Sequence, residues 1–397
     1  MSLLINIFSI ALLFGLLYSI SENKKSVKFK PIAYGIAAQL TLTFFFIKIP
    51  IGQKAILAFS NGFQKVMSYA NDGLTFVFGS LADGKAPTGS IFAIQILCII
   101  IVFSALMSVL YYLGVIGLFV KIIGGAIQKL TGTSKAESFV ATANMFLGQT
   151  EAPILIKSYL PKMTRSEIFT VLVSGMGSVA GSILVGYNLL GVPMEYLLLA
   201  CALVPTSSLL VAKILVPETE ESELNNVTMD RKGDNTSLVE ALAKGTTDGV
   251  GMAIGVAGSL IAIISLVAMV NGGLSLIGTS LQEILSYIFL PFGMMFGIPF
   301  HEAQQVASLL GQKVTLNEFI AFSDYVKMMG DLSPRASQMV AIALTGFANL
   351  SSIGICVVGI SVLAPEKRPI LSKLAPKAMV GGALVSFLSA LFVGLFI

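Results

Sequence analysis

Long apolar runs that alternate with short polar loops dominate the chain. An α-helix needs about 20 apolar residues to cross the hydrocarbon core of a bilayer. Runs near this length lie at 2–20, 31–50, 90–117, 166–190, 194–215, 249–271, 337–363 and 378–397. The segments 53–80, 119–162 and 280–330 are too short or too interrupted to span, and they predict interfacial helices and hairpins. The pattern predicts an all-α polytopic membrane protein with eight transmembrane helices and two re-entrant hairpins.

The composition agrees with this class of protein. Hydrophobic residues make up 55% of the 397 residues and charged residues only 12%, which is more apolar surface than a soluble domain could bury. The first run has no positive residue ahead of it and no small-x-small cleavage site before Lys24, which favours a retained span over a signal peptide. The three cysteines lack CxxC spacing and predict neither a disulfide nor a metal site. A net charge of +4 without a basic stripe predicts no nucleic-acid partner.

Lysine and arginine residues gather in three short loops. The clusters are Lys24, Lys25, Lys28 and Lys30; Lys129, Lys135, Lys157, Lys162 and Arg165; and Lys367, Arg368, Lys373 and Lys377. Because positive loops stay in the cytoplasm, all three clusters are expected on that side of the membrane. This orientation places both termini outside the cytoplasm, and it suits the plasma (inner) membrane of a bacterium.

The chain divides into two halves that resemble each other. Each half contains a span, an amphipathic interfacial helix, a hairpin with an acidic tip and two further spans. We assign 1–88 to N-terminal spans, an interfacial helix and scaffold elements, 89–216 to a first repeat with hairpin 1, 217–244 to a cytoplasmic polar linker, and 245–397 to a second repeat with hairpin 2. Three spans per repeat make the second copy inverted, and inverted repeats with broken helices are typical of secondary transporters.

Hairpin 1 carries a polar cluster among apolar helices. The capping-box sequence from Ser134 to Glu137 starts its first helix, the chain breaks near Gly148, and Pro153 starts the return helix. Gln149, Thr150 and Glu151 lie in the break. A carboxylate at membrane depth costs about 2.5 kcal/mol or more, and irregular backbone is tolerated there only where it lines a cavity. These residues therefore predict a binding site, with a hydrogen-bonded tie between hairpin and helix as the alternative.

Two spans and the second hairpin tip carry further polar residues. Glu318 lies at the hairpin tip, and Asn349 and Ser352, three apart in 337–363, are expected to share a helix face and to suit a diol. Small residues fill 174–182 in another span. We favour close helix packing there. The alternative is a locally unwound helix whose carbonyls coordinate an ion.

The motifs GQTEAP at 148–153, NEF at 317–319 and GFANLSS at 346–352 resemble, in this order, those of the concentrative nucleoside transporter family. The resemblance covers nearly the whole chain. It implies a homotrimer, embedded in membrane lipid, that takes up nucleosides such as uridine, cytidine or adenosine by moving a transport domain across a scaffold. It also implies two groups of substrate-binding residues, one for the base (Gln149, Thr150 and Glu151) and one for the ribose (Glu318, Asn349, Ser352 and Phe347).

The same resemblance implies a sodium site formed by Asn144, Leu147, Ser178 and Val179, because residues of these types hold the cation in the family. Proton-coupled bacterial relatives tend to lack the hairpin asparagine, so Asn144 favours Na+ as the coupling ion, with H+ as the alternative. Oxygen ligands suit a hard cation. No organic cofactor is predicted. By the same analogy, Gly148 and Ile183 help to shape the base pocket.

Three alternatives remain open from the sequence. The chain could couple transport to protons, carry a nucleobase, or be a membrane-embedded enzyme in which two buried carboxylates act as acid and base. The last alternative is disfavoured because the chain has no HExxH or GxSxG motif. His301, the only histidine, is interpreted as structural and not as a proton relay. The preference between purines and pyrimidines does not follow from the sequence.

Overall fold

The structure, a computed structural model, describes residues 2–83, 86, 89, 91–222, 224 and 235–397. This described part contains helices and no strands. The α-helices are α1 (Ser2–Ser19), α2 (Phe29–Lys48), α3 (Pro50–Phe78), α4 (Cys98–Tyr112), α5 (Val115–Thr131), α6 (Lys135–Ala143), α7 (Arg165–Gly177), α8 (Gly181–Leu190), α9 (Met194–Leu215), α10 (Leu238–Leu274), α11 (Leu281–Ile288), α12 (Leu290–Met294), α13 (Phe300–Thr315), α14 (Glu318–Met328), α15 (Pro334–Leu344), α16 (Leu350–Leu363) and α17 (Arg368–Gly394). A π-helical turn (Ala93–Leu97) leads into α4, and 3-10 turns lie at Lys24–Ser26, Gly79–Ala82, Ala152–Ile156, Leu160–Lys162, Ser275–Ile277 and Pro365–Lys367.

Most of the predicted spans coincide with long apolar helices. Within the described residues, seven helical stretches are long and apolar enough to cross a membrane. They are Ser2–Ser19, Phe29–Lys48, Ala93–Tyr112, Arg165–Leu190, Met194–Leu215, Leu238–Ile277 and Pro365–Gly394. The predicted span at 337–363 is instead two shorter helices, α15 and α16, so the expectation of one continuous helix there was wrong.

Two helices are broken in the middle, one in each half of the chain. Residues 178–180 separate α7 from α8, and residues 345–349 separate α15 from α16. The small-residue run at 174–182 is therefore unwound at 178–180, as our second interpretation expected of the backbone. It also packs closely, as the first interpretation expected, because a β-carbon on Gly177 would lie 2.9 Å from the Val385 side chain. In the other break Gly346 has a φ of 137°, which interrupts the helix, and the Asn349 side chain restarts it by accepting from the Ser352 N–H at 3.1 Å.

The two breaks lie against each other. The Phe347 N–H donates to the Ser178 carbonyl at 2.9 Å, and a β-carbon on Gly346 would lie 2.9 Å from the Gly177 carbonyl oxygen. Gly346→Ala should therefore both strain the backbone and push the breaks apart. We expect a loss of about 1–3 kcal/mol of stability, seen as a lower melting temperature in detergent.

Gly354→Ala is the matched control for this variant, because Gly354 lies in α16 and a β-carbon added to it would meet no atom of another segment within 4 Å. Alanine is the better helix former, so this control should melt at the same temperature or higher. Equal melting temperatures for the two variants would mean that the contact between the breaks contributes little.

The first helix of hairpin 1 begins as predicted, but the return segment differs from the prediction. The Ser134 N–H donates to the Glu137 carboxylate at 3.0 Å and the Glu137 N–H donates to the Ser134 hydroxyl at 3.4 Å, so the capping box is formed. The return segment consists of 3-10 turns and not of the α-helix predicted from Pro153. Pro161 would fall inside a helix that starts at Pro153, and it lacks the N–H that the α-helical ladder would need there, which explains the difference.

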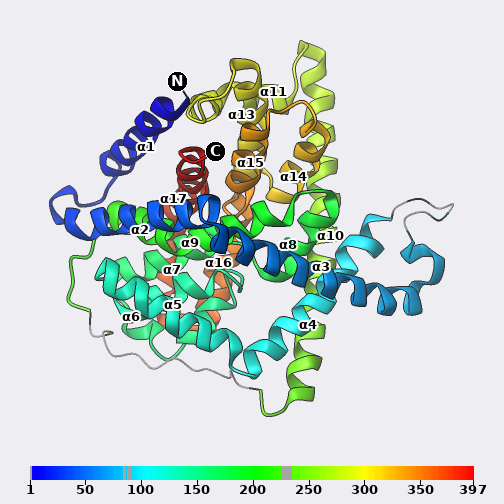
Figure 1. The fold of residues 1–397 in the computed structure, drawn as a ribbon, viewed down its shortest axis with the longest axis horizontal. Helices are drawn as coiled ribbons and strands as arrows, with labels where there is room; N and C mark the ends of the chain where they lie inside the picture. The colour runs from blue at the N-terminus through cyan, green and yellow to red at the C-terminus, as the bar shows by residue number, and fades with distance from the viewer. Residues whose placement is uncertain (1, 84–85, 87–88, 90, 223, 225–234) are drawn as a thin grey trace.

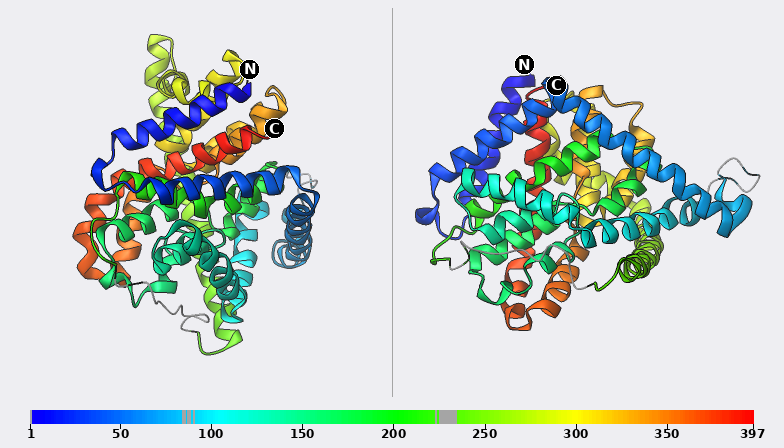
Figure 2. Two further views of the ribbon diagram at one scale, coloured as in Figure 1. Left: turned by 60° about the vertical axis from the view of Figure 1, so that its left-hand side comes forward. Right: turned by 60° about the horizontal axis from the view of Figure 1, so that its bottom comes forward.

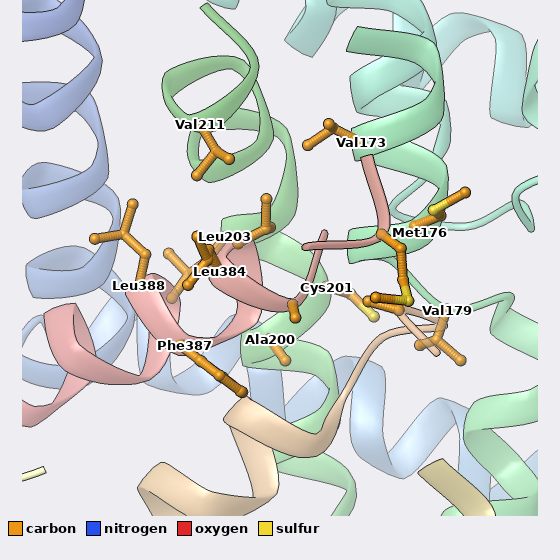
Figure 3. Packing of buried hydrophobic residues seen from close by; sticks show 14 of the residues in the cluster. Val173, Met176, Val179, Ala200, Cys201, Leu203, Val211, Leu384, Phe387 and Leu388 are labelled. Carbon is orange, nitrogen blue, oxygen red and sulfur yellow. The ribbon is translucent and has the colours of Figure 1, made fainter. Parts of the chain in front are cut away.

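Small residues bring the long helices close together. A β-carbon on Gly245 of α10 would lie 2.6 Å from the Ser108 β-carbon of α4, so the two helices cross in close contact. In Figure 1, α10 runs from top to bottom of the molecule, to the right of α17, which lies near the centre. Figure 3 shows part of the core, where side chains of α7, α9 and α17 meet.

Three of the predicted cytoplasmic segments meet at one end of the molecule. Glu22, in the loop after α1, pairs with Arg165 at 3.0 Å and with Lys377 at 3.6 Å, and the Lys367 ammonium donates to the Met163 carbonyl at 2.7 Å. Burial raises the pKa of Glu22, but the hydrogen bonds and charges of Arg165 and Lys377 outweigh it and hold that pKa below its ordinary value. The two ends of the chain lie close together in another part of the molecule (Figure 2). There the Asn6 amide of α1 donates to the Leu391 carbonyl of α17 at 3.4 Å.

The linker predicted at 217–244 differs from the structure at its end. Residues 223 and 225–234 of it lie outside the described residues. From Leu238 onward the predicted linker belongs to α10, because the Ser237 hydroxyl caps the helix by accepting from the Glu240 N–H at 3.1 Å. The helix therefore starts about three turns before its apolar part at 249–271, and only the apolar part is visible in the sequence pattern.

Candidate functional site

A cavity of about 270 Å³ lies where the two hairpin tips and the two helix breaks converge. All seven residues predicted to bind substrate line it: Gln149, Thr150, Glu151, Glu318, Phe347, Asn349 and Ser352. Gly148 and Ile183, expected to shape the base pocket, line it as well. The structure thus brings together residues that are about 200 positions apart in the chain.

The hairpin 1 turn is tied to α16 and also faces the cavity. The Gln149 amide donates to the Ser352 hydroxyl at 3.5 Å and accepts from the Cys356 thiol at 3.1 Å. The Glu151 carboxylate accepts from the Gly148 N–H at 3.0 Å, which fixes the turn. The structural tie that we considered as an alternative is therefore present, in the same side chains that line the cavity.

Glu318 is held by partners from two other elements, α8 and the cap of α16. It is the first residue of α14, where the positive end of the helix favours a carboxylate, and it is only 5% exposed. Its two oxygens accept from the Tyr187 hydroxyl at 3.1 Å and from the Asn349 amide at 3.0 Å. An ionised carboxylate has about four lone-pair sites, so these two bonds leave acceptor capacity for a ligand.

Asn349 and Ser352 are adjacent for a different reason from the one predicted. We expected them to share the face of a continuous helix, but Asn349 caps α16 and Ser352 lies in its first turn. The Asn349 carbonyl oxygen accepts from the Ser351 hydroxyl at 2.6 Å, and the Ser352 hydroxyl donates to the Phe347 carbonyl. The cap thus orients the amide of Asn349 toward Glu318.

Sequence reasoning missed several residues of the site. Tyr187 and Cys356 were not predicted, and neither was the wall that α10 contributes through Met252, Gly255, Val256, Ser259 and Leu260. Tyr187 is fully buried in an apolar helix, where a phenolic hydroxyl needs a polar partner, so the lone tyrosine was an available signal. The α10 wall carried no signal because its residues are apolar or small.

The residues predicted for a cation lie beside the substrate cavity and do not line it. Asn144 is fully buried and ends α6; its amide nitrogen donates to the Ser174 hydroxyl at 3.0 Å, while its carbonyl oxygen has no hydrogen-bond partner. The Gly181 N–H donates to the Phe146 carbonyl at 2.9 Å, which holds the first helix break against hairpin 1. A buried oxygen without a donor is what a cation ligand requires.

The remaining predicted cation residues are consistent with an oxygen-only site. Leu147 and Val179 are buried apolar residues that could offer only backbone carbonyls, and the Ser178 hydroxyl donates to the Gly175 carbonyl at 3.0 Å. Among the described residues there is no cluster of histidine, cysteine and carboxylate side chains that would suit a transition metal. The amide and hydroxyl oxygens of Asn144 and Ser178 are hard ligands, which suit a hard cation. His301 is exposed near the start of α13.

Comparison with known proteins identifies the family of this chain. Three family models match this chain. The model described as the N-terminus of Na+ dependent nucleoside transporters matches residues 8–81, and the model described as nucleoside recognition matches residues 93–194. The model described as the C-terminus of Na+ dependent nucleoside transporters matches residues 196–394. The uncharacterized transporter YutK of Bacillus subtilis is 40% identical, with 98% of this chain and 97% of YutK covered. The nucleoside permease NupC of Helicobacter pylori is 37% identical, with 100% and 98% covered.

A solved structure has the same fold as this chain. CNTnw in an inward-facing, substrate-bound state matches with a TM-score of 0.95 and 39% identity, covering 100% of this chain and 98% of CNTnw. The matches extend over the whole chain, including both hairpins and both helix breaks. The chain therefore belongs to the Na+ dependent nucleoside transporter family.

Proposed function

We propose that this protein imports nucleosides by symport with sodium. The observation that carries the proposal is the convergence of the seven predicted substrate residues, from both halves of the chain, on one cavity. Its volume of about 270 Å³ is close to the lower end of the range for small-ligand sites, about 300 Å³. Membership of a transporter family favours transport of an unaltered solute over catalysis.

Glu318, Asn349 and Ser352 would hold the ribose, with Phe347 beside the sugar. The free acceptor capacity of the Glu318 carboxylate suits two hydroxyl donors, and charge-assisted hydrogen bonds are stronger than neutral ones. Tyr187, which donates to Glu318, would orient the carboxylate. This arrangement favours a nucleoside over a free nucleobase, because a nucleobase has no sugar hydroxyls to donate.

Gln149, Thr150 and Glu151 would face the base. In the structure the Gln149 amide bonds to Ser352 and Cys356, and a ligand could exchange these bonds for the donors and acceptors of a base edge. The apolar wall of α10 closes the other side of the cavity. Uridine, cytidine and adenosine are the substrates that we propose to test.

The sodium ion would be held by Asn144, Leu147, Ser178 and Val179, through the unpartnered Asn144 carbonyl oxygen, the Ser178 hydroxyl and backbone carbonyls. Because Gly181 and Phe146 join the helix break to hairpin 1, an ion there would stiffen the turn that carries Gln149 and Thr150. Sodium binding would thus prepare the substrate cavity, which is the basis of coupling.

We further propose the setting in which transport takes place. The hairpin-bearing domain would move across a scaffold in an elevator-like manner. CNTnw, the relative described above, has been solved in an inward-facing state and, as a doubly substituted variant, in an outward-facing state. Only 11% of the apolar part of α10 is buried within the chain, which suits contact with lipid or with other subunits of a homotrimer. The positive loops favour the plasma membrane of a bacterium with both termini outside.

Uridine uptake into proteoliposomes tests this function. A sodium gradient and a proton gradient are imposed separately, and radiolabelled uridine inside the vesicles is measured and identified. We expect accumulation of unaltered uridine with sodium alone. Accumulation with protons alone would overturn the sodium site, and absence of uptake with uridine, cytidine and adenosine would overturn the substrate assignment.

A further inference from the structure

Lys313, near the end of α13, is a buried cation that the proposed function does not use. Its side chain is fully buried, and none of the described carboxylates forms an ion pair with it. Even after relaxation, removing an ammonium group from water costs several kcal/mol. A lysine kept in this position therefore needs compensating contacts, and these contacts indicate its role.

The Lys313 ammonium lies at the end of a half-helix. It donates to the Ala343 carbonyl in the last turn of α15 at 2.7 Å and to the Ser386 hydroxyl of α17 at 2.5 Å, and it lies 5.7 Å from the centre of the Phe387 ring. The last four carbonyls of α15 have no partner within the helix, because the helix breaks after Leu344. The negative end of the helix dipole stabilises a cation there.

The first half of the chain has the same arrangement of elements around its proposed sodium site. Asn144 ends the first helix of hairpin 1 and contacts Ser174, which lies in the last turn of α7 just before the break at 178–180. In the second half, Lys313 lies in the last turn of the first helix of hairpin 2 and contacts Ala343, just before the break at 345–349. In both halves the end of a hairpin helix meets the end of a half-helix.

We infer that the Lys313 ammonium is a tethered cation that takes, in the second half of the chain, the place that the transported sodium takes in the first. Its two bonds to Ala343 and Ser386 replace the oxygen ligands of an ion. Lys313 also lies five positions before Glu318, the carboxylate that would hold the ribose. The consequence is that one half of the transporter carries a covalently attached cation, so that each nucleoside needs one sodium ion and not two.

This inference rests on the proposed function, since the sodium site of the first half is part of it. The test measures how uridine affinity depends on sodium concentration, by calorimetry of the purified full-length protein. The slope of log affinity against log sodium activity equals the number of sodium ions that bind together with uridine. The unmodified protein should give a slope of about one.

Lys313→Asn and Lys313→Gln remove the ammonium and offer an oxygen ligand at two side-chain lengths. If one of the two variants does not fold, the other can still be measured. In these variants a second sodium ion should bind, and the slope should rise to about two. Lys313→Met leaves neither charge nor ligand; its slope should stay at about one while uridine binds about tenfold more weakly. Lys327→Asn, a control at a surface lysine of α14, should behave like the unmodified protein.

A slope that stays at about one in both Lys313→Asn and Lys313→Gln would overturn the inference, whatever their affinity, and so would a slope of about two in Lys313→Met. A second measurement needs no variant. The reversal potential of uridine flux in proteoliposomes should correspond to one sodium ion per uridine, and a ratio of two would overturn the inference. An unmodified protein whose uridine binding ignores sodium would instead contradict the proposed function.

Discussion

Replacing Glu318 by glutamine should abolish measurable sodium-driven uridine uptake while the protein still folds. Glutamine keeps the shape and one acceptor, so the bonds from Tyr187 or Asn349 are partly retained. The variant loses the charge that would strengthen two hydrogen bonds from the ribose, each worth about 1.5–3 kcal/mol. The expected loss of uridine affinity is therefore about 100-fold or more, measured by calorimetry beside the uptake assay.

Asp324→Asn is the matched control for this variant. Asp324 lies on the same helix, α14, but pairs with the surface residue Lys327 at 2.8 Å and does not line the cavity. Its loss should leave uptake unchanged. Normal uridine uptake by Glu318→Gln would remove Glu318 from the ribose site, whereas normal binding with lost uptake would move its role from substrate recognition to transport.

The parts of the fold that follow from hydrophobic patterning were predictable from the sequence. Apolar runs of sufficient length identified helices such as α9 and α17, because a membrane span must be apolar along its whole length. The polar tips at Gln149 and Glu318 were identifiable for the complementary reason: buried polar groups are costly and therefore rare. Where the pattern is apolar throughout, however, it does not distinguish a continuous helix from a broken one.

The breaks and caps could not be read from the pattern, because they depend on contacts between segments far apart in the chain. Gly346 interrupts a helix where its backbone meets Gly177, and Asn349 starts the next helix as a cap. The bond between Tyr187 and Glu318 joins residues from different halves. The residues that the family resemblance implies for substrate binding do line one cavity, although the resemblance gave no account of what holds them there.

Lys313 illustrates the same limit. In the sequence it follows Gly311 and Gln312 in a moderately polar stretch, which is ordinary for the exposed face of an amphipathic helix. Only the packing of α15 and α17 around it turns the lysine into a buried cation. Charge in a sequence is therefore informative about a site only when the burial of the charged group is known.

Replacing Asn144 by alanine should make uridine uptake require much more sodium. The variant removes the buried carbonyl oxygen that has no donor, and with it one proposed ligand of the ion. The sodium concentration for half-maximal uptake should rise about tenfold or more, because binding of a hard cation depends on the number of oxygen ligands. Uridine affinity at saturating sodium should change little.

Two further variants separate ligation by Asn144 from its structural role. Ser174→Ala removes the acceptor of the Asn144 amide nitrogen but leaves the carbonyl oxygen in place, so sodium dependence should change only slightly. Asn188→Ala is the control for loss of an asparagine away from the site, since the Asn188 amide donates to the Val192 carbonyl at 2.9 Å and does not line the cavity. If Asn144→Ala needs no more sodium than these two, the ion is held elsewhere. If uptake by Asn144→Ala no longer depends on sodium but runs on a proton gradient, Asn144 is the residue that selects the coupling ion.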